Sequence, residues 1–498
     1  MDSFSQDIYI KNTLSGDKEL FKPISEGRVG MYVCGPTVYG EPHLGHARSA
    51  ITFDVIYRYF SFLGLKVRYV RNITDVGHLE DELADQGEDK IIKKARLEQL
   101  EPMEVAQRYT NLYRDTMAKL NVLPPSIEPT ASGHITEQIE VIQEILSNGM
   151  AYESNGSVYL DVNAYADKYH YGELSGRVLD ELMAGSRDLE GQQEKKNPAD
   201  FALWKRAEAS HIMQWSSPWG KGFPGWHIEC TAMSKKYLGL PFDIHGGGMD
   251  LKFPHHEAEI AQSYAAFGCT PVNYWLHNNM MTLKGQKMAK SKGNFITLGQ
   301  MFSGEHELLL QAYDPMTVRF LMLQAHYGSV IDFSNEALKS AEIACNKLQK
   351  GLELIGGLES KSDKIVDNEL SQQILTACEN CYVKMNDDFN TAQVLASLFE
   401  LMSLANKFEN KESNVTEEAL SQLKRTFKGF FCDVLGIQPQ ESSENDYLPE
   451  VMEIISEIRN DARSKKDFQM ADFIRDRLAV IGIKIKDSID KTTFEFNG

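Results

Sequence analysis

The stretch from residue 29 to residue 73 constrains the fold more than any other part of the sequence. It begins with a short apolar run, VGMYVC, and a loop rich in glycine and proline. A segment with apolar residues at helical spacing follows and ends at Gly64. A second strand-like run, KVRYVRNI, occupies 66–73. This order predicts a βαβ unit of a parallel sheet, in which ligands bind at the carboxyl ends of the strands.

The composition is that of an ordinary folded protein. The chain has 498 residues, of which 42% are hydrophobic and 25% charged, and this length predicts about three or four domains. No run approaches the roughly 20 apolar residues of a membrane span, and no secretory signal is visible. Seven irregularly spaced cysteines favour a reduced, cytoplasmic protein. The net charge of −19 argues against a protein that coats nucleic acid or a membrane surface.

The residue pattern divides the chain into six parts. We expect an α/β fold with a Rossmann-like parallel-sheet domain, an inserted subdomain, a helical bundle and a small mixed C-terminal unit. Cys378 and Cys381 form a CxxC, which we interpret as part of a bundle helix and not as a metal or redox site. The expected parts are the first half of the Rossmann-like domain at 1–120, the insertion at 121–205, the second half at 206–275, a subdomain with a lysine-rich loop at 276–335, the bundle at 336–437 and the C-terminal unit at 438–498.

Two histidines lie at the predicted start of the first helix, in the sequence HLGH. A helix start presents unpaired N–H groups and the positive end of the helix dipole, which attract phosphate. His43 and His46 could donate to an α-phosphate as charge builds in a transition state, and Gly45 would let a flat base approach the backbone. A pair of helix-start histidines without any ligand is the alternative interpretation.

A lysine-rich loop, KMAKS, begins 244 residues after His43. Lys287 and Lys290 of this loop are suited to neutralising the pyrophosphate that leaves a triphosphate during displacement. The plainer alternative is a solvated basic loop. The combination of HLGH and KMAKS is more specific than either motif alone.

Four further residues have side chains that zinc accepts as ligands. Cys34 ends the first strand, Cys230 lies in GWHIEC, and His255 and Glu259 share one face of a predicted helix. Their wide separation leaves the plain alternative of buried cysteines and a solvated helix start. His256, three residues before Glu259, is a rival for His255 on spacing.

These motifs resemble known signatures. HLGH and KMAKS resemble the HIGH and KMSKS motifs of class I aminoacyl-tRNA synthetases, with Leu44 in place of Ile and Ala289 in place of the first Ser. CGPTVYGEPHLGH, GWHIEC and GGGMDLKFPHHEAEIAQ resemble the cysteinyl-tRNA synthetase family. The resemblance extends from about Tyr32 to the C-terminal MADFIRDRL.

The resemblance implies one zinc ion per chain, held by Cys34, Cys230, His255 and Glu259 and bound by the sulfur of the substrate. A soft thiolate binds zinc far better than a neutral hydroxyl, so cysteine is separated from serine without an editing site. The insertion, about 85 residues by the expected boundaries, is small for such a site.

Further substrate contacts are expected around this pocket. Thr74 ends the second strand and is expected to bond the amino or carboxylate group, and Trp226 is expected to wall off the pocket. Gly248 and Asp250 follow a strand, where they would join Gly45 in binding ATP. The alternative interpretations are that Thr74 is a turn residue at the end of a strand, that Trp226 is a core tryptophan, and that the glycines form an ordinary turn.

The resemblance implies ATP-dependent attachment of L-cysteine to the 3′-terminal ribose of tRNA(Cys) through a cysteinyl-adenylate. His43, His46, Lys287 and Lys290 would be catalytic, Lys290 would also bind ATP, and Mg²⁺ would accompany it. We expect a cytoplasmic monomer with no membrane partner. The bundle and the C-terminal unit would reach the anticodon. A basic cluster in that unit could neutralise phosphate, and a solvated helix face is the alternative interpretation; its residues are Arg459, Arg463, Lys465 and Lys466.

Three other functions compete with this one. The nearest is the related ligase that joins cysteine to an amino sugar in mycothiol biosynthesis. It lacks an anticodon-reading C-terminus, whereas this chain continues about 160 residues past 335. A nucleotidyltransferase that uses HxGH alone is disfavoured by KMAKS. A non-catalytic tRNA-binding relative is disfavoured by the intact HLGH, the loop lysines and the four ligand types.

Overall fold

The chain forms two compact units, which are described separately: Met1–Gln438 and Pro439–Gly498. The computed structural model describes most of both. The described residues are 7–77, 79–81, 86–179, 194–208, 211–283, 285–287, 295–360, 364–410, 414–439, 448–480, 483–487 and 492–496. None of the helices in these ranges has the length and apolarity needed to cross a membrane.

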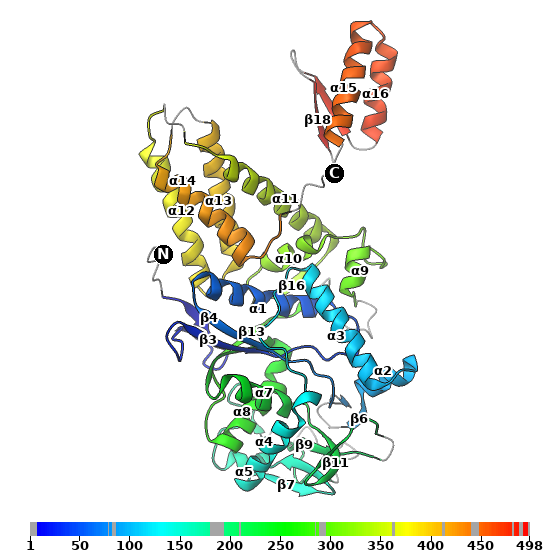
Figure 1. The fold of residues 1–498 in the computed structure, drawn as a ribbon, viewed down its shortest axis with the longest axis vertical. Helices are drawn as coiled ribbons and strands as arrows, with labels where there is room; N and C mark the ends of the chain where they lie inside the picture. Colours follow the sequence, from blue (N-terminus) through cyan, green and yellow to red (C-terminus); the bar gives the residue numbers. More distant parts are fainter. Residues whose placement is uncertain are drawn as a thin grey trace. The chain divides into compact units, whose positions relative to one another are not determined.

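A parallel sheet of four strands, in the order β13-β12-β3-β4, lies at the centre of the first unit (Figure 1). Its strands are β3 (Arg28–Val33), β4 (Lys66–Arg71), β12 (Phe242–Gly248) and β13 (Val272–Asn278). Helix α1 (Leu44–Phe62) connects β3 to β4, which confirms the predicted βαβ unit. The Rossmann-like α/β class is therefore confirmed.

Helices cover both faces of this sheet. Helix α1 lies on one face, between the sheet and the helical bundle, and its residues are buried on most sides. The other face carries α7 (Ile228–Leu238) and α8 (His255–Phe267), and α4 (Ile135–Ser147) packs against both of these helices.

The insertion contains an antiparallel sheet of five strands in the order β10-β11-β9-β8-β7. Its strand β9 pairs with β8 and β11, so the sheet continues past residue 205, where we expected the insertion to end. The Gly- and Pro-rich sequence after that point hides two short strands from a periodicity analysis. The elements are β7 (Ala151–Ser154), β8 (Ser157–Leu160), α5 (Val162–Ala166), β9 (Phe201–Arg206), β10 (Trp215–Ser217) and β11 (Gly220–Pro224).

The start of the expected insertion also belongs to the central sheet. Ile127 and Thr130 form parallel bridges to Val70 and Ile73, which extend the sheet beyond β4. The remaining short elements of this half are β1 (Tyr9–Lys11), β2 (Lys18–Leu20), β5 (Leu79–Asp81), β6 (Gln86–Asp89), α2 (Lys90–Glu98), α3 (Pro102–Lys119), η1 (Ser132–His134) and η3 (Met249–Lys252).

The lysine-rich loop belongs to a small sheet in the order β15-β14-β16. Lys287 ends β15, and nothing of its side chain is described; Lys290 lies outside the described residues. The elements of this part are β14 (Met281–Leu283), β15 (Gln286–Lys287), α9 (Leu298–Ser303), α10 (Pro315–Leu323) and β16 (Ile331–Phe333).

Four long helices form the predicted bundle, followed by the π-helix η5 (Gly429–Val434), which packs on α1. Cys378 and Cys381 are buried in α12, as predicted, and burial raises the pKa of the Cys378 thiol to about 12. The helices are α11 (Asn335–Gly357), α12 (Asn368–Asn386), α13 (Thr391–Asn410) and α14 (Glu417–Lys428).

The second unit has a small core of its own around Met452, Leu478 and Ile483. One residue of the expected basic cluster is not on its surface: Arg459 is buried and donates Nε–H to the carbonyl of Ala471 at 3.3 Å. The elements are α15 (Leu448–Ser464), α16 (Phe468–Val480) and the antiparallel pair β17 (Ile483–Asp487) and β18 (Thr492–Phe496).

Candidate active site and metal centre

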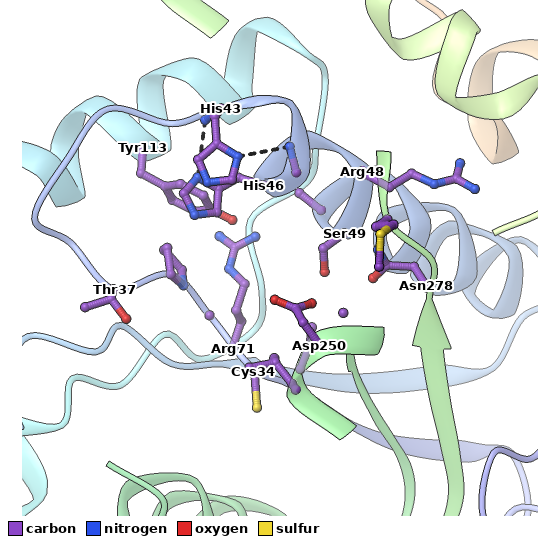
Figure 2. Close-up of a pocket in the computed structure, with 18 of the residues that line it drawn as sticks. Cys34, Thr37, His43, His46, Arg48, Ser49, Arg71, Tyr113, Asp250 and Asn278 are labelled. Atoms are coloured by element: carbon purple, nitrogen blue, oxygen red, sulfur yellow. Dashed lines mark hydrogen bonds between the residues drawn. The ribbon is translucent and has the colours of Figure 1, made fainter. Parts of the chain in front are cut away.

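A cavity of about 510 Å³ opens at the carboxyl ends of the parallel strands (Figure 2). This is the edge at which a parallel α/β sheet binds ligands. The lining includes most of the expected site residues, and also several that the motifs did not indicate. The lining residues include Cys34, Gly35, His43, Gly45, His46, Arg48, Tyr69, Arg71, Tyr113, Trp226, Gly248 and Asp250.

The two histidines of HLGH orient each other at the start of α1. His43 is the N-cap, and its Nδ1 accepts from the N–H of Gly45 at 3.1 Å. The Nδ1 of His46 accepts in turn from the N–H of His43 at 3.3 Å, which completes a capping box. Their rings stack with centroids 3.8 Å apart, and the His46 ring meets Tyr113 edge-on. Both imidazoles are therefore held in place beside the N–H groups of the helix start.

A side chain at position 45 would displace the His43 ring. A Cβ atom at this position would lie 2.9 Å from His43 Cε1, closer than unbonded carbon atoms approach. Gly248 is under a similar constraint, because a Cβ there would lie 2.5 Å from Asp250 Oδ1. Both glycines thus let a neighbouring polar side chain lie against the backbone in the wall of the cavity.

The chain segment that follows the lysine-rich loop meets the helix start. Phe295 packs edge-on against the ring of His43, with centroids 4.9 Å apart. Thr297 forms a β-bridge with His43, and the N–H of Leu298 donates to the carbonyl of Pro42 at 2.8 Å. The end of the loop is therefore fixed beside HLGH, although the two motifs are 244 residues apart in the sequence.

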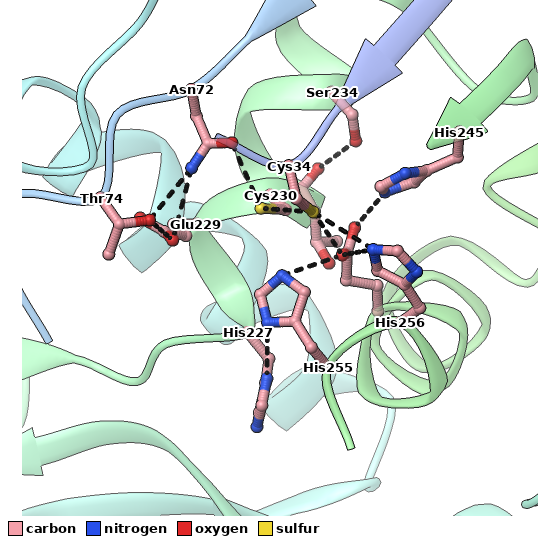
Figure 3. Close-up of polar contacts among 12 residues, drawn as sticks. Cys34, Asn72, Thr74, His227, Glu229, Cys230, Ser234, His245, His255 and His256 are labelled. Atoms are coloured by element: carbon pink, nitrogen blue, oxygen red, sulfur yellow. Dashed lines mark hydrogen bonds and ion pairs between the residues drawn. The ribbon is translucent and has the colours of Figure 1, made fainter. Parts of the chain in front are cut away.

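Behind Cys34 lies a buried cluster of thiol, imidazole and carboxylate groups (Figure 3). The Sγ atoms of Cys34 and Cys230 are 3.7 Å apart, Cys34 Sγ is 3.8 Å from Glu259 Oε1, and His255 Nε2 is 3.2 Å from that oxygen. A tetrahedral zinc ion with bonds of about 2.3 Å to sulfur separates two sulfur ligands by about 3.8 Å. The spacing of these four side chains fits such an ion.

A second, overlapping set of donors shares part of this cluster. Among the described residues, Cys34, His245, His256 and Glu259 also bring one donor atom each within 4.8 Å of one another. His256 Nε2 is 3.2 Å from Cys34 Sγ, while its Nδ1 is 2.7 Å from His277 Nε2. The geometry alone therefore accommodates either His255 or His256.

Residues that the motifs did not indicate hold this cluster in place. His245 Nε2 is 2.8 Å from Glu259 Oε2, which leaves Oε1 facing the thiols, and His227 Nδ1 is 3.0 Å from His255 Nδ1. Carboxylate and imidazole ligands are commonly oriented by such outer partners. The sequence signals for these two residues were their positions: His227 is three residues before Cys230, and His245 directly precedes the triple glycine.

The electrostatics of the cluster favour a thiolate at Cys34. Burial raises the pKa of this thiol, but the hydrogen bond with Cys230 and the positive charge of His255 outweigh burial and lower the pKa to about 6. Burial lowers the pKa of His255, while Cys34 and Glu259 raise it to about 10. Burial raises the pKa of the Glu259 carboxyl, and His245 and His255 lower it to about 2.

The two expected substrate-contacting residues lie in different places. Trp226 lines the cavity and packs its ring 4.4 Å from the ring of His255. Thr74 is buried, does not line the cavity, and donates its hydroxyl to the carboxyl of Glu229 (Figure 3). Burial raises the pKa of that carboxyl well above its usual value.

Comparisons with known proteins identify the class. Residues 20–343 match the family model "tRNA synthetases class I (C) catalytic domain", and residues 382–439 match the "DALR domain". Among solved structures, a Mycobacterium tuberculosis methionyl-tRNA synthetase in complex with methionyl-adenylate shares the fold. It has a TM-score of 0.54 at 14% identity, covering 86% of this chain and 94% of that one. The fold and the family match therefore define a class I aminoacyl-tRNA synthetase.

Curated relatives narrow the class. Proteins named Cysteine–tRNA ligase match this chain at 56% identity in Phocaeicola vulgatus, over 98% of this chain and 99% of the relative, and at 46% in Chlorobaculum tepidum, over 98% of each. The chain belongs to the cysteine–tRNA ligase family of class I synthetases. This confirms the family indicated by the sequence motifs.

Proposed function

We propose that this chain attaches L-cysteine to the 3′-terminal ribose of tRNA(Cys) in two steps. The cysteine carboxylate attacks the α-phosphate of ATP to give cysteinyl-adenylate and pyrophosphate, and the terminal 2′-hydroxyl of tRNA then attacks the adenylate. The observation that carries this proposal is that Cys34, which belongs to the cluster of possible metal ligands, and the HLGH helix start line one cavity. A cysteine substrate held by its thiol at the Cys34 end would direct its carboxylate toward an ATP phosphate at the HLGH end.

Zinc is the metal that this donor set favours. Cys34, Cys230, His255 and Glu259 would hold it, and two thiolates with one imidazole and one carboxylate suit a thiophilic ion. We prefer His255 to His256 because only this set contains both cysteines. When bound, zinc would act as a Lewis acid that binds the thiol of cysteine in preference to the hydroxyl of serine.

The chain's own residues do the remaining work. Stacked His43 and His46 would donate to the α-phosphate beside the N–H groups of α1. Lys287 and Lys290 would neutralise the leaving pyrophosphate, with Mg²⁺ on the nucleotide. Phe295 and Thr297 anchor the end of their loop at His43, which supports this assignment.

Other side chains would position the substrates. Trp226 would close the cavity wall against the amino acid, and Thr74 would act through the Glu229 carboxyl beside the cluster. Gly45, Gly248 and Asp250 would bind ATP at the carboxyl ends of the strands.

We propose that the tRNA contacts several of the six expected parts of the chain. We propose that the inserted and loop-bearing parts meet the acceptor end, and that the bundle and the C-terminal unit meet the rest of the tRNA. The alignment with cysteine–tRNA ligases covers nearly the whole chain, including the bundle and the C-terminal unit, and this supports tRNA over an amino sugar as acceptor. We further propose that the protein acts as a cytoplasmic monomer.

The test is ATP–pyrophosphate exchange with cysteine and, in parallel, with serine, followed by charging assays with tRNA(Cys). Cysteine should support exchange and serine should not, with about one zinc ion per chain. Equal activity with serine would contradict zinc selection, and a cysteinyl amino sugar as product would favour the competing ligase. Cys230→Ala should lose zinc and raise the KM for cysteine; Cys378→Ala, in the bundle, is the matched control.

A further inference from the structure

Arg71 is a buried cation in the wall of the active-site cavity. It is the last residue of β4 and is 4% exposed. Its Nη2 is 2.8 Å from Glu128 Oε1, and its guanidinium carbon lies 5.1 Å from the ring centre of Tyr113. The guanidinium is thus held firmly by one ion pair and one aromatic face.

Two nitrogen atoms of this side chain form no hydrogen bond with the part of the chain that the structure describes. Nε and Nη1 of Arg71 are buried without a hydrogen bond, although a guanidinium carries five N–H donors. The hydroxyl of Tyr69, which also lines the cavity, is buried and interacts with the charge of Arg71, but it forms no hydrogen bond of normal geometry with the described residues. Leaving buried donors unpaired costs free energy, and native proteins rarely do so without a functional reason.

Among the described residues, Glu128 is the carboxylate that pairs with Arg71, while Asp250 and Glu41 line the same cavity. Glu128 Oε2 is 2.6 Å from Nε of Arg114, so one carboxylate serves two guanidinium groups and the cluster keeps a net positive charge. Arg48, another cation in the lining, donates from Nη1 and Nη2 to the carbonyls of Met322 and His326 at 2.6 and 2.7 Å, and its Nε is buried without a hydrogen bond to the described residues. An anion in the cavity would complement the charge that Arg71 contributes.

The position of Arg71 indicates which anion this is. Its Cγ lies 3.3 Å from where a Cβ of Gly35 would be, beside Cys34. Its guanidinium reaches the ring of Tyr113, which also contacts His46. Figure 2 shows the side chain extending from the Cys34 side of the cavity toward His46. A cysteine substrate with its thiol near Cys34 would place its reacting carboxylate between that thiol and the phosphate near His46, which is where Arg71 lies.

We propose that Arg71 is a catalytic residue that binds the reacting carboxylate and α-phosphate oxygens during adenylate formation. This inference rests on the proposed function. In that step a carboxylate oxygen forms a bond to the α-phosphorus, the bond to the pyrophosphate oxygen breaks with its electron pair, and no proton is transferred. Negative charge builds on the oxygens around phosphorus, and the guanidinium fork can donate to two of them at once.

The experiment compares four variants by cysteine-dependent ATP–pyrophosphate exchange, with thermal unfolding and zinc content measured for each. Arg71→Met should lower kcat about 100-fold, with the KM values for cysteine and ATP changed only a few-fold. Arg71→Lys should be intermediate, because it restores the charge without the fork. Zinc content should stay at the wild-type value.

Glu128→Gln is the matched control, because it breaks the same ion pair and keeps the arginine. It should stay within a few-fold of wild-type kcat. Glu128 keeps its ion pair with Arg114 in Arg71→Met, so this variant should stay folded, and Arg71→Met/Glu128→Gln should show the same kcat loss. Equal kcat losses in Arg71→Met and Glu128→Gln, or recovery of kcat in the double variant, would overturn the proposal. Absence of exchange by the wild type would instead overturn the proposed function.

Discussion

At the scale of single residues, the chemistry of Cys34 is set by its neighbours. Cys230 and His255 lower the pKa of its thiol to about 6 against the effect of burial. At pH 7 roughly nine-tenths of such a group is thiolate, whereas an ordinary cysteine is only a few per cent ionised. Cys34 in the metal-free protein should therefore react with iodoacetamide at neutral pH.

The pH dependence of this reaction has a definite sign. Alkylation of Cys34 in the chelated protein should fall as the pH drops through about 6, and should level off above it. His255→Gln removes the positive charge and should shift the profile toward higher pH. Mass spectrometry of the modified peptide gives the rate. A midpoint at pH 8 or 9 in the wild type would contradict the ion pair.

A substitution at Gly45 should affect the activity of the site without affecting the stability of the fold. Gly45→Ala should favour the helix, because alanine is the better helix former. The new Cβ would lie 2.9 Å from His43 Cε1 and displace that ring. We expect kcat for exchange to fall by about 100-fold while the unfolding temperature is kept. Ser61→Ala, exposed at the other end of α1, should leave both unchanged; a parallel loss of stability in Gly45→Ala would contradict this explanation.

At the scale of elements, a buried ion cluster connects α1 to the bundle. Asp54 of α1 accepts from Arg58 at 2.8 Å and also pairs with Arg319 of α10. Arg319 is fully buried and donates to the carbonyls of Leu435 and Leu120 at 2.7 and 2.9 Å. One guanidinium thus holds α1, the end of α3 and the end of η5 together.

Breaking this cluster should be expensive. Arg319→Met leaves a buried carboxylate under-compensated, and we expect a loss of about 3 kcal/mol in the free energy of unfolding, measured in urea. Arg68→Met, at an exposed arginine of β4, should cost less than about 0.5 kcal/mol. Asp54→Leu combined with Arg319→Met should lose less than the sum of the two single variants. Additive losses would contradict a direct interaction.

At the scale of the whole molecule, the chain divides into two units at Gln438. The cavity and the ligand cluster lie wholly in the first unit. A chain ended after Gln438 should therefore retain cysteine-dependent exchange within a few-fold, and should lose most of its charging of tRNA(Cys). Both assays can be run on the same preparation. Loss of exchange together with charging would show that the second unit supports the active site.

The net charge of −19 bears on the tRNA as a partner. A protein with this acidic charge would bind tRNA through a limited set of exposed basic residues. Burial of Arg459 removes one residue from that set. The logarithm of the affinity should fall against the logarithm of salt concentration with a modest slope of about 3 to 5. Filter binding at several salt concentrations measures it; a slope near 10 would indicate an extensive phosphate interface.

Local patterns predicted a large part of this structure. The βαβ unit and the bundle helices follow from periodicity, because side-chain burial imposes a period on each element. The short strands between 206 and 224 did not follow, because each is too short to show a period. Arg71 was interpreted only as part of a strand, since nothing in KVRYVR shows that its last side chain enters a cavity.

The sequence by itself determined the family, the parallel α/β class and the motifs that carry the chemistry, because these depend on residue identity and short-range spacing. Only the tertiary structure decided which distant groups meet: Cys34 with Cys230 and Glu259, Phe295 with His43, and Arg71 with Tyr113. Such contacts join residues that are tens to hundreds of positions apart, and their distances follow from how strands and helices pack. No local pattern encodes that packing, so the charge that Arg71 brings to the cavity became visible only in the folded chain.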